Sequence, residues 1–514
     1  MRRESKSVRP LRRDGWMGVW AMAVGAVLAL ATGLAAAQAE PTLALKACRL
    51  KGVSTEARCG VLKRPLDPGQ PQGVQIDLHV AVLPALARNK LPDPVFFFAG
   101  GPGQSAIALA GRVSGLMGRF LNRRDVVLID QRGTGQSAPL QCDDSASALR
   151  LLREQIDPAR ETARLKACLA RLQKLPYGDL RMYTTTIAMA DAEAVRLALA
   201  LGPVNLIGGS YGTRAVLEYL RAYPASVRRA VIDGVAPPDM VLMRAMSADN
   251  QVALDGLLDD CEQSPVCGKS YPQLRQRWQA MLASLPREAV VVHPLTGASE
   301  TVTLTRDAVL GLVRTPLYLP AYASALPYAI SEAANGRFTP LVGVGTGLGG
   351  GAKGMELAAG MHFSVVCAED FPRLPLATDA PGRDLGSASE NVYRELCASW
   401  PRGEVPAAFY SVPAAASPVL VLSGSSDPVT PPRHGERVAK SLGPQALHLV
   451  VPNAGHGVMG LGCMADLMYR FVDQPDPALA LKTAREEASC AAKVPRPGAY
   501  VPMGLAAENR KPAP

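Results

Sequence analysis

A serine flanked by glycines is the feature of the chain that most directly points to chemistry. The run Gly208-Gly209-Ser210-Tyr211-Gly212 matches the pattern Gly-x-Ser-x-Gly, in which the glycines leave room for a sharp turn that exposes the serine hydroxyl. A hydroxyl becomes a strong nucleophile only when a base takes its proton, so the pattern predicts a histidine and an orienting carboxylate elsewhere. The pattern alone is weak, because a chain with 47 glycines matches it by chance now and then.

The two partners that this chemistry needs occur near the C-terminus. Asp427 follows the apolar run Pro418–Gly424, and His456 lies in a glycine-flanked loop after the apolar run Ala446–Val451. Ser210, Asp427 and His456 thus occur in the order of the catalytic triad of the α/β-hydrolase fold. In this hypothesis His456 takes the serine proton, and Asp427 orients the imidazole and stabilises its charged form. A lone histidine is more often structural, so the joint match carries the hypothesis.

A glycine-rich loop supplies candidate donors for the developing oxyanion. Gly100-Gly101-Pro102-Gly103 follows the continuous apolar run 95–99, which is typical of a buried strand. Proline has no N–H, so the first donor is expected to be the N–H of Gly101, and the second that of Tyr211. A tight turn without a catalytic role explains the glycines of this loop equally well.

These side chains need a scaffold that brings distant parts of the chain together. Apolar runs alternate with helical periodicity, which predicts an α/β protein with a mostly parallel sheet and helices on both faces, the α/β-hydrolase fold. The run 74–82 alternates apolar and polar residues, as a half-exposed antiparallel strand does. The predicted strands cover residues 60–63, 74–82, 95–99, 126–129, 204–207, 230–234, 418–424 and 446–451, and the predicted helices cover 184–201, 213–223 and 433–442.

The alternation of strands and helices fades after residue 237 and resumes near residue 411. The intervening residues are helix-rich with Pro and Gly breaks, which predicts an inserted helical cap. The expected organisation is a signal peptide at 1–37, a first part of the α/β-hydrolase core at 38–237, the cap at 238–410, a second part of the core at 411–475 and a Pro- and Ala-rich C-terminal tail at 476–514.

The first 37 residues resemble an export signal. A basic segment ends at Arg13, an uncharged apolar stretch runs from Gly15 to Ala37, and small residues at 35–39 are suited to cleavage. An uncleaved membrane anchor is the alternative, because 23 uncharged residues can span a bilayer. The alanine cluster favours cleavage. We therefore expect a secreted or periplasmic protein with no stable membrane insertion after cleavage.

The cysteines fit an exported protein. Their number is even, they occur as sequential neighbours, and none forms a Cys-x-x-Cys pair, which weakens zinc and redox interpretations. Five local disulfides are the simplest hypothesis for Cys48, Cys59, Cys142, Cys168, Cys261, Cys267, Cys367, Cys397, Cys463 and Cys490. The sequence contains no His-x-x-x-His pair or comparable ligand cluster, so we expect neither a metal nor another cofactor.

Composition and charge exclude few classes of protein, but they argue against a nucleic-acid partner. The chain is 48% hydrophobic and 19% charged, which is ordinary for a globular protein. Six basic and two acidic residues within 1–37 supply four of the ten net positive charges. The remaining excess is mild and has no Lys/Arg cluster interleaved with aromatic residues, so nucleic-acid binding is not expected.

Three motifs of the chain are Gly100-Gly101-Pro102-Gly103, Asp130-Gln131-Arg132-Gly133-Thr134-Gly135-Gln136-Ser137 and Gly208-Gly209-Ser210-Tyr211-Gly212-Thr213-Arg214. Together they resemble the prolyl iminopeptidase and tripeptidyl aminopeptidase family of serine hydrolases, and its exported, cysteine-containing branch fits best. The loops with Asp427 and His456 resemble that family too. One departure is Ala99, where many prolyl iminopeptidases have histidine.

The resemblance implies the release of residues or short peptides from peptides with a free N-terminus. It also implies that carboxylates of the cap bind the substrate ammonium group, and Glu369 and Asp370 are the candidates. Two alternatives remain open from the residues. One is a secreted carboxylesterase or lipase with the same triad, because the shape of the cap decides between esters and peptides. The other is a catalytically silent binding protein on the same scaffold.

Overall fold

The computed structural model describes residues 42–142, 151–347 and 357–503, which belong to one compact unit. The predicted signal peptide lies outside the described residues. None of the helices in the described ranges combines the length and apolar character needed to cross a membrane.

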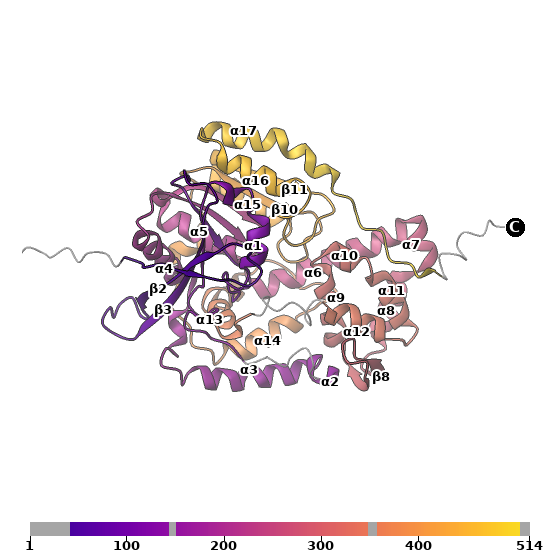
Figure 1. The fold of residues 1–514 in the computed structure, drawn as a ribbon. Coiled ribbons are helices and arrows are strands. Elements are labelled where there is room, and N and C mark those ends of the chain that lie inside the picture. The colour runs from indigo at the N-terminus through magenta and orange to yellow at the C-terminus, as the bar shows by residue number, and fades with distance from the viewer. Residues whose placement is uncertain (1–41, 143–150, 348–356, 504–514) are drawn as a thin grey trace, which may run out of the picture. The chain divides into compact units, whose positions relative to one another are not determined.

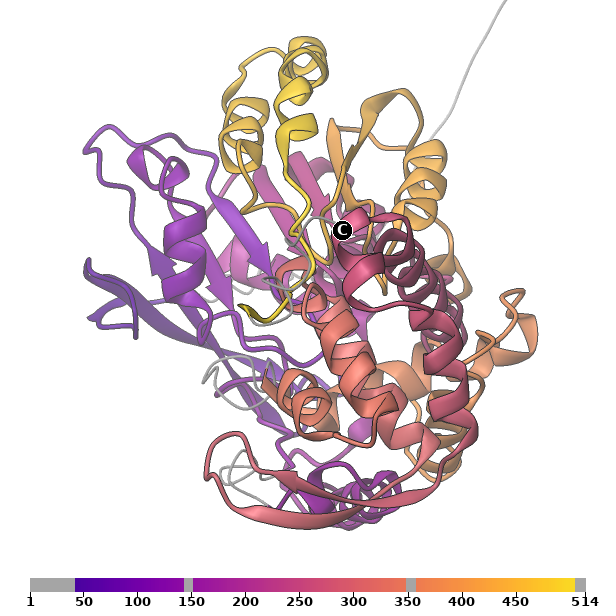
Figure 2. The same ribbon diagram turned by 90° about the vertical axis from the view of Figure 1, so that its right-hand side faces the viewer.

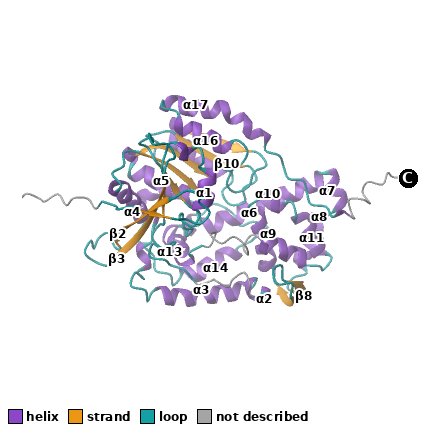
Figure 3. Cartoon of the chain, in the orientation of Figure 1, coloured by secondary structure: helices purple, strands orange, loops and turns teal. Residues whose placement is uncertain are grey.

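A nine-stranded sheet forms the centre of this unit, with the strand order β1-β2-β3-β5-β4-β6-β7-β10-β11. The first three strands are antiparallel, and the six strands from β5 to β11 run parallel to one another. The predicted mostly parallel sheet is thereby confirmed (Figure 3). Its strands are β1 (Lys46–Cys48), β2 (Ala57–Pro65), β3 (Gln75–Leu83), β4 (Val95–Phe98), β5 (Val126–Ile129), β6 (Val204–Gly209), β7 (Val227–Asp233), β10 (Val419–Gly424) and β11 (Ala446–Val451).

Alternate residues of the parallel strands enter two separate apolar clusters, one on each face of the sheet. In β6, Leu206 belongs to one cluster and Ile207 to the other. The first cluster includes side chains of α4 (Thr185–Ala198), α5 (Tyr211–Ala222) and α15 (Pro432–Leu442). The second includes side chains of α1 (Ala110–Leu116), α16 (Met464–Asp473) and α17 (Pro477–Glu487), and the last two helices lie side by side (Figure 1).

Helix α17 differs from the tail expected at 476–514. Asp476 caps the helix by accepting the N–H of Ala478, and Pro477 occupies its first turn, where its missing N–H is not needed. Ala480 and Ala484, four residues apart, are buried against the second cluster. The Pro- and Ala-rich composition that indicated a tail therefore also suits a short, closely packed helix.

The described residues between β7 and β10, for which we keep the name of the predicted cap, form helices and a two-stranded hairpin. Their apolar core is separate from the two clusters of the sheet and includes Leu254, Trp278, Leu310 and Ile330. Helices α8, α9, α11 and α12 pack against one another (Figures 1 and 2). The elements are α6 (Leu242–Gln263), α7 (Pro265–Ser270), α8 (Leu274–Ala283), β8 (Arg287–Val292), β9 (Ser299–Leu304), α9 (Arg306–Leu317), α10 (Pro320–Ala323), α11 (Leu326–Ala334), α12 (Thr339–Gly347), α13 (Ala359–Glu369) and α14 (Ala388–Cys397). Two further helices, α2 (Leu152–Gln155) and α3 (Pro158–Leu172), precede α4.

The hairpin β8–β9 was not expected from the sequence, and it lies apart from the large sheet (Figure 3). The strand β9 alternates exposed and buried residues, and Val302 and Leu304 on its buried face join the apolar core of the cap. This alternation of Thr with apolar residues is the period of a half-buried strand.

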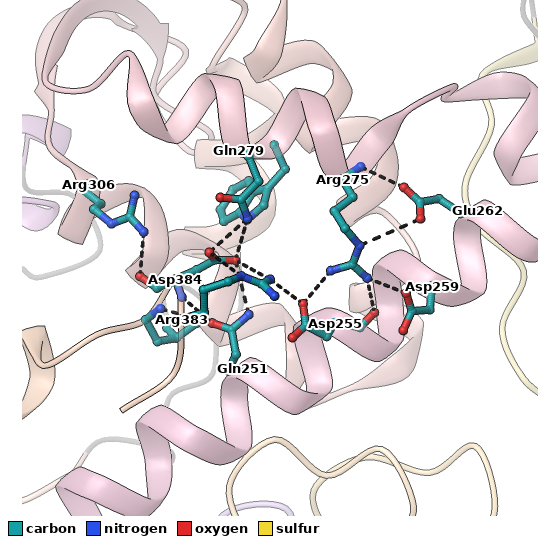
Figure 4. Close-up of polar contacts among 11 residues, drawn as sticks. Gln251, Asp255, Asp259, Glu262, Arg275, Gln279, Arg306, Arg383 and Asp384 are labelled. Atoms are coloured by element: carbon teal, nitrogen blue, oxygen red, sulfur yellow. Dashed lines mark hydrogen bonds and ion pairs between the residues drawn. The ribbon is translucent and has the colours of Figure 1, made fainter. Parts of the chain in front are cut away.

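A buried carboxylate anchors one loop of the cap (Figure 4). Asp384 is 2% exposed and accepts hydrogen bonds from Trp278 Nε1 at 3.1 Å and Gln279 Nε2 at 3.0 Å, both on α8. Gln251 on α6 donates to Asp384 Oδ2 at 3.3 Å, and its side-chain oxygen accepts the backbone N–H of Asp384 at 2.7 Å. The loop before α14 is thereby fixed to two helices of the cap.

Five disulfides join the cysteines in sequential pairs, as predicted. Each links neighbouring elements, such as α13 with α14 through Cys367 and Cys397. The pairs are Cys48–Cys59, Cys142–Cys168, Cys261–Cys267, Cys367–Cys397 and Cys463–Cys490.

Candidate active site

Ser210 occupies the turn between β6 and α5. Its φ of 56° lies in the left-handed region, which is uncommon for residues other than glycine and stores strain where the surrounding structure enforces it. The turn packs closely against the end of β4, because a Cβ on Gly212 would lie 2.2 Å from the carbonyl oxygen of Phe98. Only glycine fits there, so the second glycine of the Gly-x-Ser-x-Gly pattern has a steric cause.

Asp427 and His456 lie on the loops that follow β10 and β11, and their side chains meet. His456 Nδ1 lies 2.8 Å from Asp427 Oδ2, so the ring donates its Nδ1–H to the carboxylate and leaves Nε2 as a proton acceptor. The other carboxylate oxygen accepts the backbone N–H groups of Val429 at 2.8 Å and Thr430 at 2.9 Å. The carboxylate is therefore fixed from both sides.

This pairing changes the acidity of both groups. Burial alone would raise the pKa of Asp427, but the charge and hydrogen bond of His456 and the two backbone N–H groups bring it below its ordinary value. Burial alone would lower the pKa of His456, but the charge and hydrogen bond of Asp427 raise it above its ordinary value. The pair therefore favours an imidazolium beside a carboxylate, which is the ion pair formed when a histidine takes a serine proton.

The end of β7 lies close to both Ser210 and His456. The carbonyl of Asp233 accepts the N–H of Ser210 at 2.9 Å. The next residue, Gly234, has a φ of 67°, and a Cβ on it would lie 3.2 Å from His456 Cε1. Ser210 and His456 thus flank one short segment. Among the described residues no hydrogen bond joins Ser210 Oγ to His456, and such bonds often tighten only when substrate binds.

The glycine-rich loop 100–103 lies beside the serine turn. β4 pairs in parallel with β6 so that Phe98 is level with Gly208, and the residues that follow both strands therefore meet at one edge of the sheet. Tyr211 is the first residue of α5, and the first N–H groups of a helix lack intrahelical acceptors. The N–H groups of Gly101 and Tyr211 thus come from neighbouring loops at this edge, and their role in an oxyanion hole stays a prediction.

Two family models match the chain. The model described as "alpha/beta hydrolase fold" matches residues 93–325, which carry β4 to β7 and Ser210. The model described as "TAP-like protein" matches residues 385–479, which carry Asp427 and His456. The chain is an α/β hydrolase. Within the described residues of this hydrolase, no group of three or more His, Cys, Asp or Glu side chains is placed to hold a metal ion.

The hydrolase also resembles characterised proteins over most of its length. Tripeptidyl aminopeptidase of Streptomyces lividans is 24% identical over 482 residues, which cover 86% of this chain and 85% of that protein. Serine protease Hip1 of Mycobacterium tuberculosis is 26% identical over 431 residues, covering 75% and 79%. Carboxylesterase B of the same organism is 28% identical over 462 residues, covering 83% and 86%. The family resemblance predicted from the motifs is confirmed, and the protein is a serine hydrolase similar to serine peptidases.

Glu369 and Asp370, the predicted ligands of a substrate ammonium group, contact a different cation in the hydrolase. Arg214 on α5 lies 3.3 Å from Glu369 Oε2 and 2.7 Å from Asp370 Oδ2. Glu369 also accepts the N–H of Thr185 at 2.7 Å. Both carboxylates are buried, and burial raises the pKa of Glu369 to about 7 against the opposing charge of Arg214. Their substrate-binding role stays a prediction.

Thr430 is a residue of the site that the sequence did not indicate. Its hydroxyl donates to Asp427 Oδ2 at 2.8 Å and lies 3.0 Å from His456 Nδ1, so it contacts both members of the pair. Tyr318 at the end of α9 is a second such residue, because its carbonyl accepts the N–H of His456 at 2.9 Å and its ring meets the imidazole edge-on. The only sequence signal for Thr430 was its position three residues after the candidate acid Asp427. No sequence pattern indicated Tyr318.

His362 links the glycine-rich loop to the cap. Its Nδ1 lies 3.3 Å from the carbonyl oxygen of Pro102, and its Nε2 lies 2.8 Å from the hydroxyl of Tyr393 on α14. A carbonyl only accepts, so Nδ1 carries the proton and Nε2 accepts from the tyrosine. Burial lowers the pKa of His362 to about 4, which keeps this linking ring neutral near neutral pH.

Proposed function

We propose that this hydrolase is an exported serine aminopeptidase that releases residues or short peptides from free peptide N-termini through an acyl-enzyme on Ser210. The observation that carries the proposal is the hydrogen-bonded pair of His456 and Asp427 beside the strained turn of Ser210. The peptide substrate is inferred from the relative named tripeptidyl aminopeptidase, which this chain resembles over 86% of its length.

The geometry supports a two-stage mechanism. His456 Nε2 takes the proton of Ser210 while the hydroxyl oxygen attacks the scissile carbonyl, and Asp427 stabilises the imidazolium. The N–H groups of Gly101 and Tyr211 stabilise the oxyanion, and loss of one such donor raises the barrier by about 3 kcal/mol. His456 then protonates the leaving amine. A water molecule activated by the same imidazole hydrolyses the acyl-enzyme.

The disulfides of the described residues support export. All ten cysteines lie in the five disulfides, which fit an oxidising compartment outside the cytoplasm. The export signal itself is inferred from residues 1–37. Purification of the protein from its native cells and N-terminal sequencing test this part, and a mature chain that still begins at Met1 would contradict it.

A carboxylesterase is the second candidate function, because a relative named carboxylesterase B is 28% identical over 83% of this chain. A panel of peptide amides with free and N-acetylated termini, together with a short-chain ester, separates the two functions when assayed with the wild type and Ser210→Ala. Serine-dependent cleavage confined to free-amino peptides supports the aminopeptidase. Serine-dependent turnover of the ester alone supports the esterase, and absence of both supports a silent binding protein.

The recognition of the substrate ammonium group has its own test. If Glu369 binds the substrate ammonium group, as the family resemblance implies, Glu369→Gln is expected to raise KM for free-amino peptides. An unchanged KM together with a lower unfolding temperature would contradict this role and would show that Glu369 acts only through its contacts with Thr185 and Arg214.

A further inference from the structure

The end of β7 and the residues that follow it contact both the turn of Ser210 and the loop of His456. The carbonyl of Asp233 accepts the N–H of Ser210 at 2.9 Å. The hydroxyl of Thr213 donates to the carbonyl of Ser210 at 2.6 Å and accepts the N–H of Ala236 at 2.9 Å. The serine turn is thus fixed to this segment on both sides of Ser210.

The side chain of Asp233 extends from this segment to the loop of His456. Its Oδ2 accepts the backbone N–H of Val458 at 2.7 Å and that of Met459 at 2.8 Å. These are the second and third residues after His456, so the carboxylate fixes the loop on which the candidate base is placed. One residue therefore holds the nucleophile turn through its backbone and the base loop through its side chain.

The second carboxylate oxygen of Asp233 has no structural partner. The residue is 1% exposed, and its Oδ1 is buried without a hydrogen bond in the described part of the chain. Burial of a carboxylate oxygen without a donor is unfavourable. An asparagine, whose amide oxygen can accept both N–H groups of the His456 loop, would give the same anchoring without a negative charge.

The charge of Asp233 acts on His456. The titratable groups that face the imidazole are Asp427, which is hydrogen-bonded to it, Asp233, and Tyr318, whose ring meets the imidazole edge-on. Burial raises the pKa of Tyr318 above its ordinary value, so its hydroxyl stays neutral. Burial raises the pKa of Asp233 to about 6, although the N–H groups of the loop and His456 oppose this shift. Above that pH two carboxylates stabilise the imidazolium.

We propose that Asp233 is a second carboxylate of the site: a positioning residue that fixes the Ser210 turn and the His456 loop, and whose negative charge stabilises the imidazolium formed during attack. The inference rests on the assignment of Ser210 and His456 made above. It does not depend on whether the substrate is a peptide or an ester, because both reactions pass through the same ion pair.

The test compares the wild type with Asp233→Asn, and Asp93→Asn serves as the matched control. Asp93 is buried too, but it precedes β4 at the opposite end of the parallel strands, where it contacts Arg124 and Asn205. The rate of covalent labelling of Ser210 by a fluorophosphonate probe is measured against pH, because this reaction needs the activated serine and no particular substrate.

The expected result is that Asp233→Asn moves the acid limb of the labelling profile down by about one pH unit and lowers the plateau rate by about tenfold, because one charge interaction sets both. Asp93→Asn is expected to keep the acid limb of the wild type. An unchanged acid limb in Asp233→Asn would overturn the inference. Wild-type protein that is not labelled at all would overturn it together with the triad, whereas labelling without peptide cleavage would overturn the aminopeptidase alone.

A second measurement decides the case in which Asp233→Asn does not fold. The ring nitrogens of His456 can be followed by NMR against pH in Ser210→Ala protein, since the chain has only six histidines. The inference predicts a curve with two steps, one of them near pH 6 from Asp233. A single step would overturn it.

Discussion

Arg214 on α5 donates two parallel hydrogen bonds to Asp370 at the end of α13, from Nη1 to Oδ2 at 2.7 Å and from Nη2 to Oδ1 at 3.1 Å. The same carboxylate accepts the N–H of Leu242, where α6 begins, at 3.0 Å. The helix that starts directly after Ser210 is thereby joined to two helices of the cap. Since the pair is buried, the position of the cap relative to the nucleophile depends on it.

Asp370→Asn is therefore expected to destabilise the fold by about 3–5 kcal/mol, because it leaves the buried guanidinium of Arg214 without a full counter-charge. Lys63→Met is the control, since it removes the exposed ion pair with Asp77 and is expected to change stability by less than about 1 kcal/mol. Denaturant unfolding measures both. Equal losses of stability in the two variants would show that the buried Arg214–Asp370 pair contributes no more to stability than the exposed pair.

Thr430→Val is expected to lower kcat/KM by roughly ten- to a hundredfold, because a hydrogen bond to a charged carboxylate contributes about 1.5–3 kcal/mol. The hydroxyl that is lost contacts both Asp427 and His456. Thr430→Ser keeps that hydroxyl and serves as the control. If the serine variant loses as much activity as the valine variant, the methyl group rather than the hydroxyl is what matters.

The pH dependence of turnover follows from the acidity of His456. Its pKa is raised, because the effect of Asp427 outweighs that of burial, and only the neutral ring can act as a base. The rate is therefore expected to fall as the pH drops through a pKa above 6.5, which is the ordinary value. Asp427→Asn is expected to lower kcat by about 10⁴-fold, as loss of the triad carboxylate does elsewhere. Profiles of kcat/KM against pH test this, and an acid limb below pH 6 in the wild type would contradict it.

Asp384→Leu is expected to lower the unfolding temperature by loosening the loop before α14 from α6 and α8 (Figure 4). Burial acts to raise the pKa of Asp384, but hydrogen bonds from Arg383, Gln279, Trp278 and Gln251 lower it to about 2. The carboxylate therefore stabilises the cap above its ordinary pKa of 3.8, and this contribution is lost as the pH falls through about 2.

The control for this cap variant is Asp259→Asn, which removes an exposed partner of Arg275. Thermal unfolding between pH 2 and pH 8 gives the comparison. A shift of the unfolding temperature that is no larger in the Asp384 variant than in the Asp259 variant would show that the loop does not depend on this carboxylate.

The parts of the site that carry local patterns were predictable from the sequence. The apolar runs 204–207, 418–424 and 446–451 predicted β6, β10 and β11 almost to the residue, because buried parallel strands need continuous apolar sequence. Ser210 directly follows β6, and Asp427 and His456 lie on the loops after β10 and β11, at the same edge of the sheet. The five disulfides followed from sequential pairing alone.

The parts that depend on distant contacts were not predictable. Arg214 and Asp370 are 156 residues apart in the chain, and Asp233 and Val458 are 225 apart, so no local pattern relates them. The hairpin β8–β9 was missed because its short strands lie within a helix-rich region. Helix α17 was not predicted because an alanine-rich composition is compatible both with a C-terminal tail and with a closely packed helix.

Cleavage of peptides from a free N-terminus by Ser210 can be tested by the mass of the products released from one long peptide with a free or an acetylated terminus. N-terminal fragments are expected from the free peptide only, and none are expected with Ser210→Ala protein. Equal cleavage of the acetylated peptide, or cleavage that survives the loss of the Ser210 hydroxyl, would contradict it.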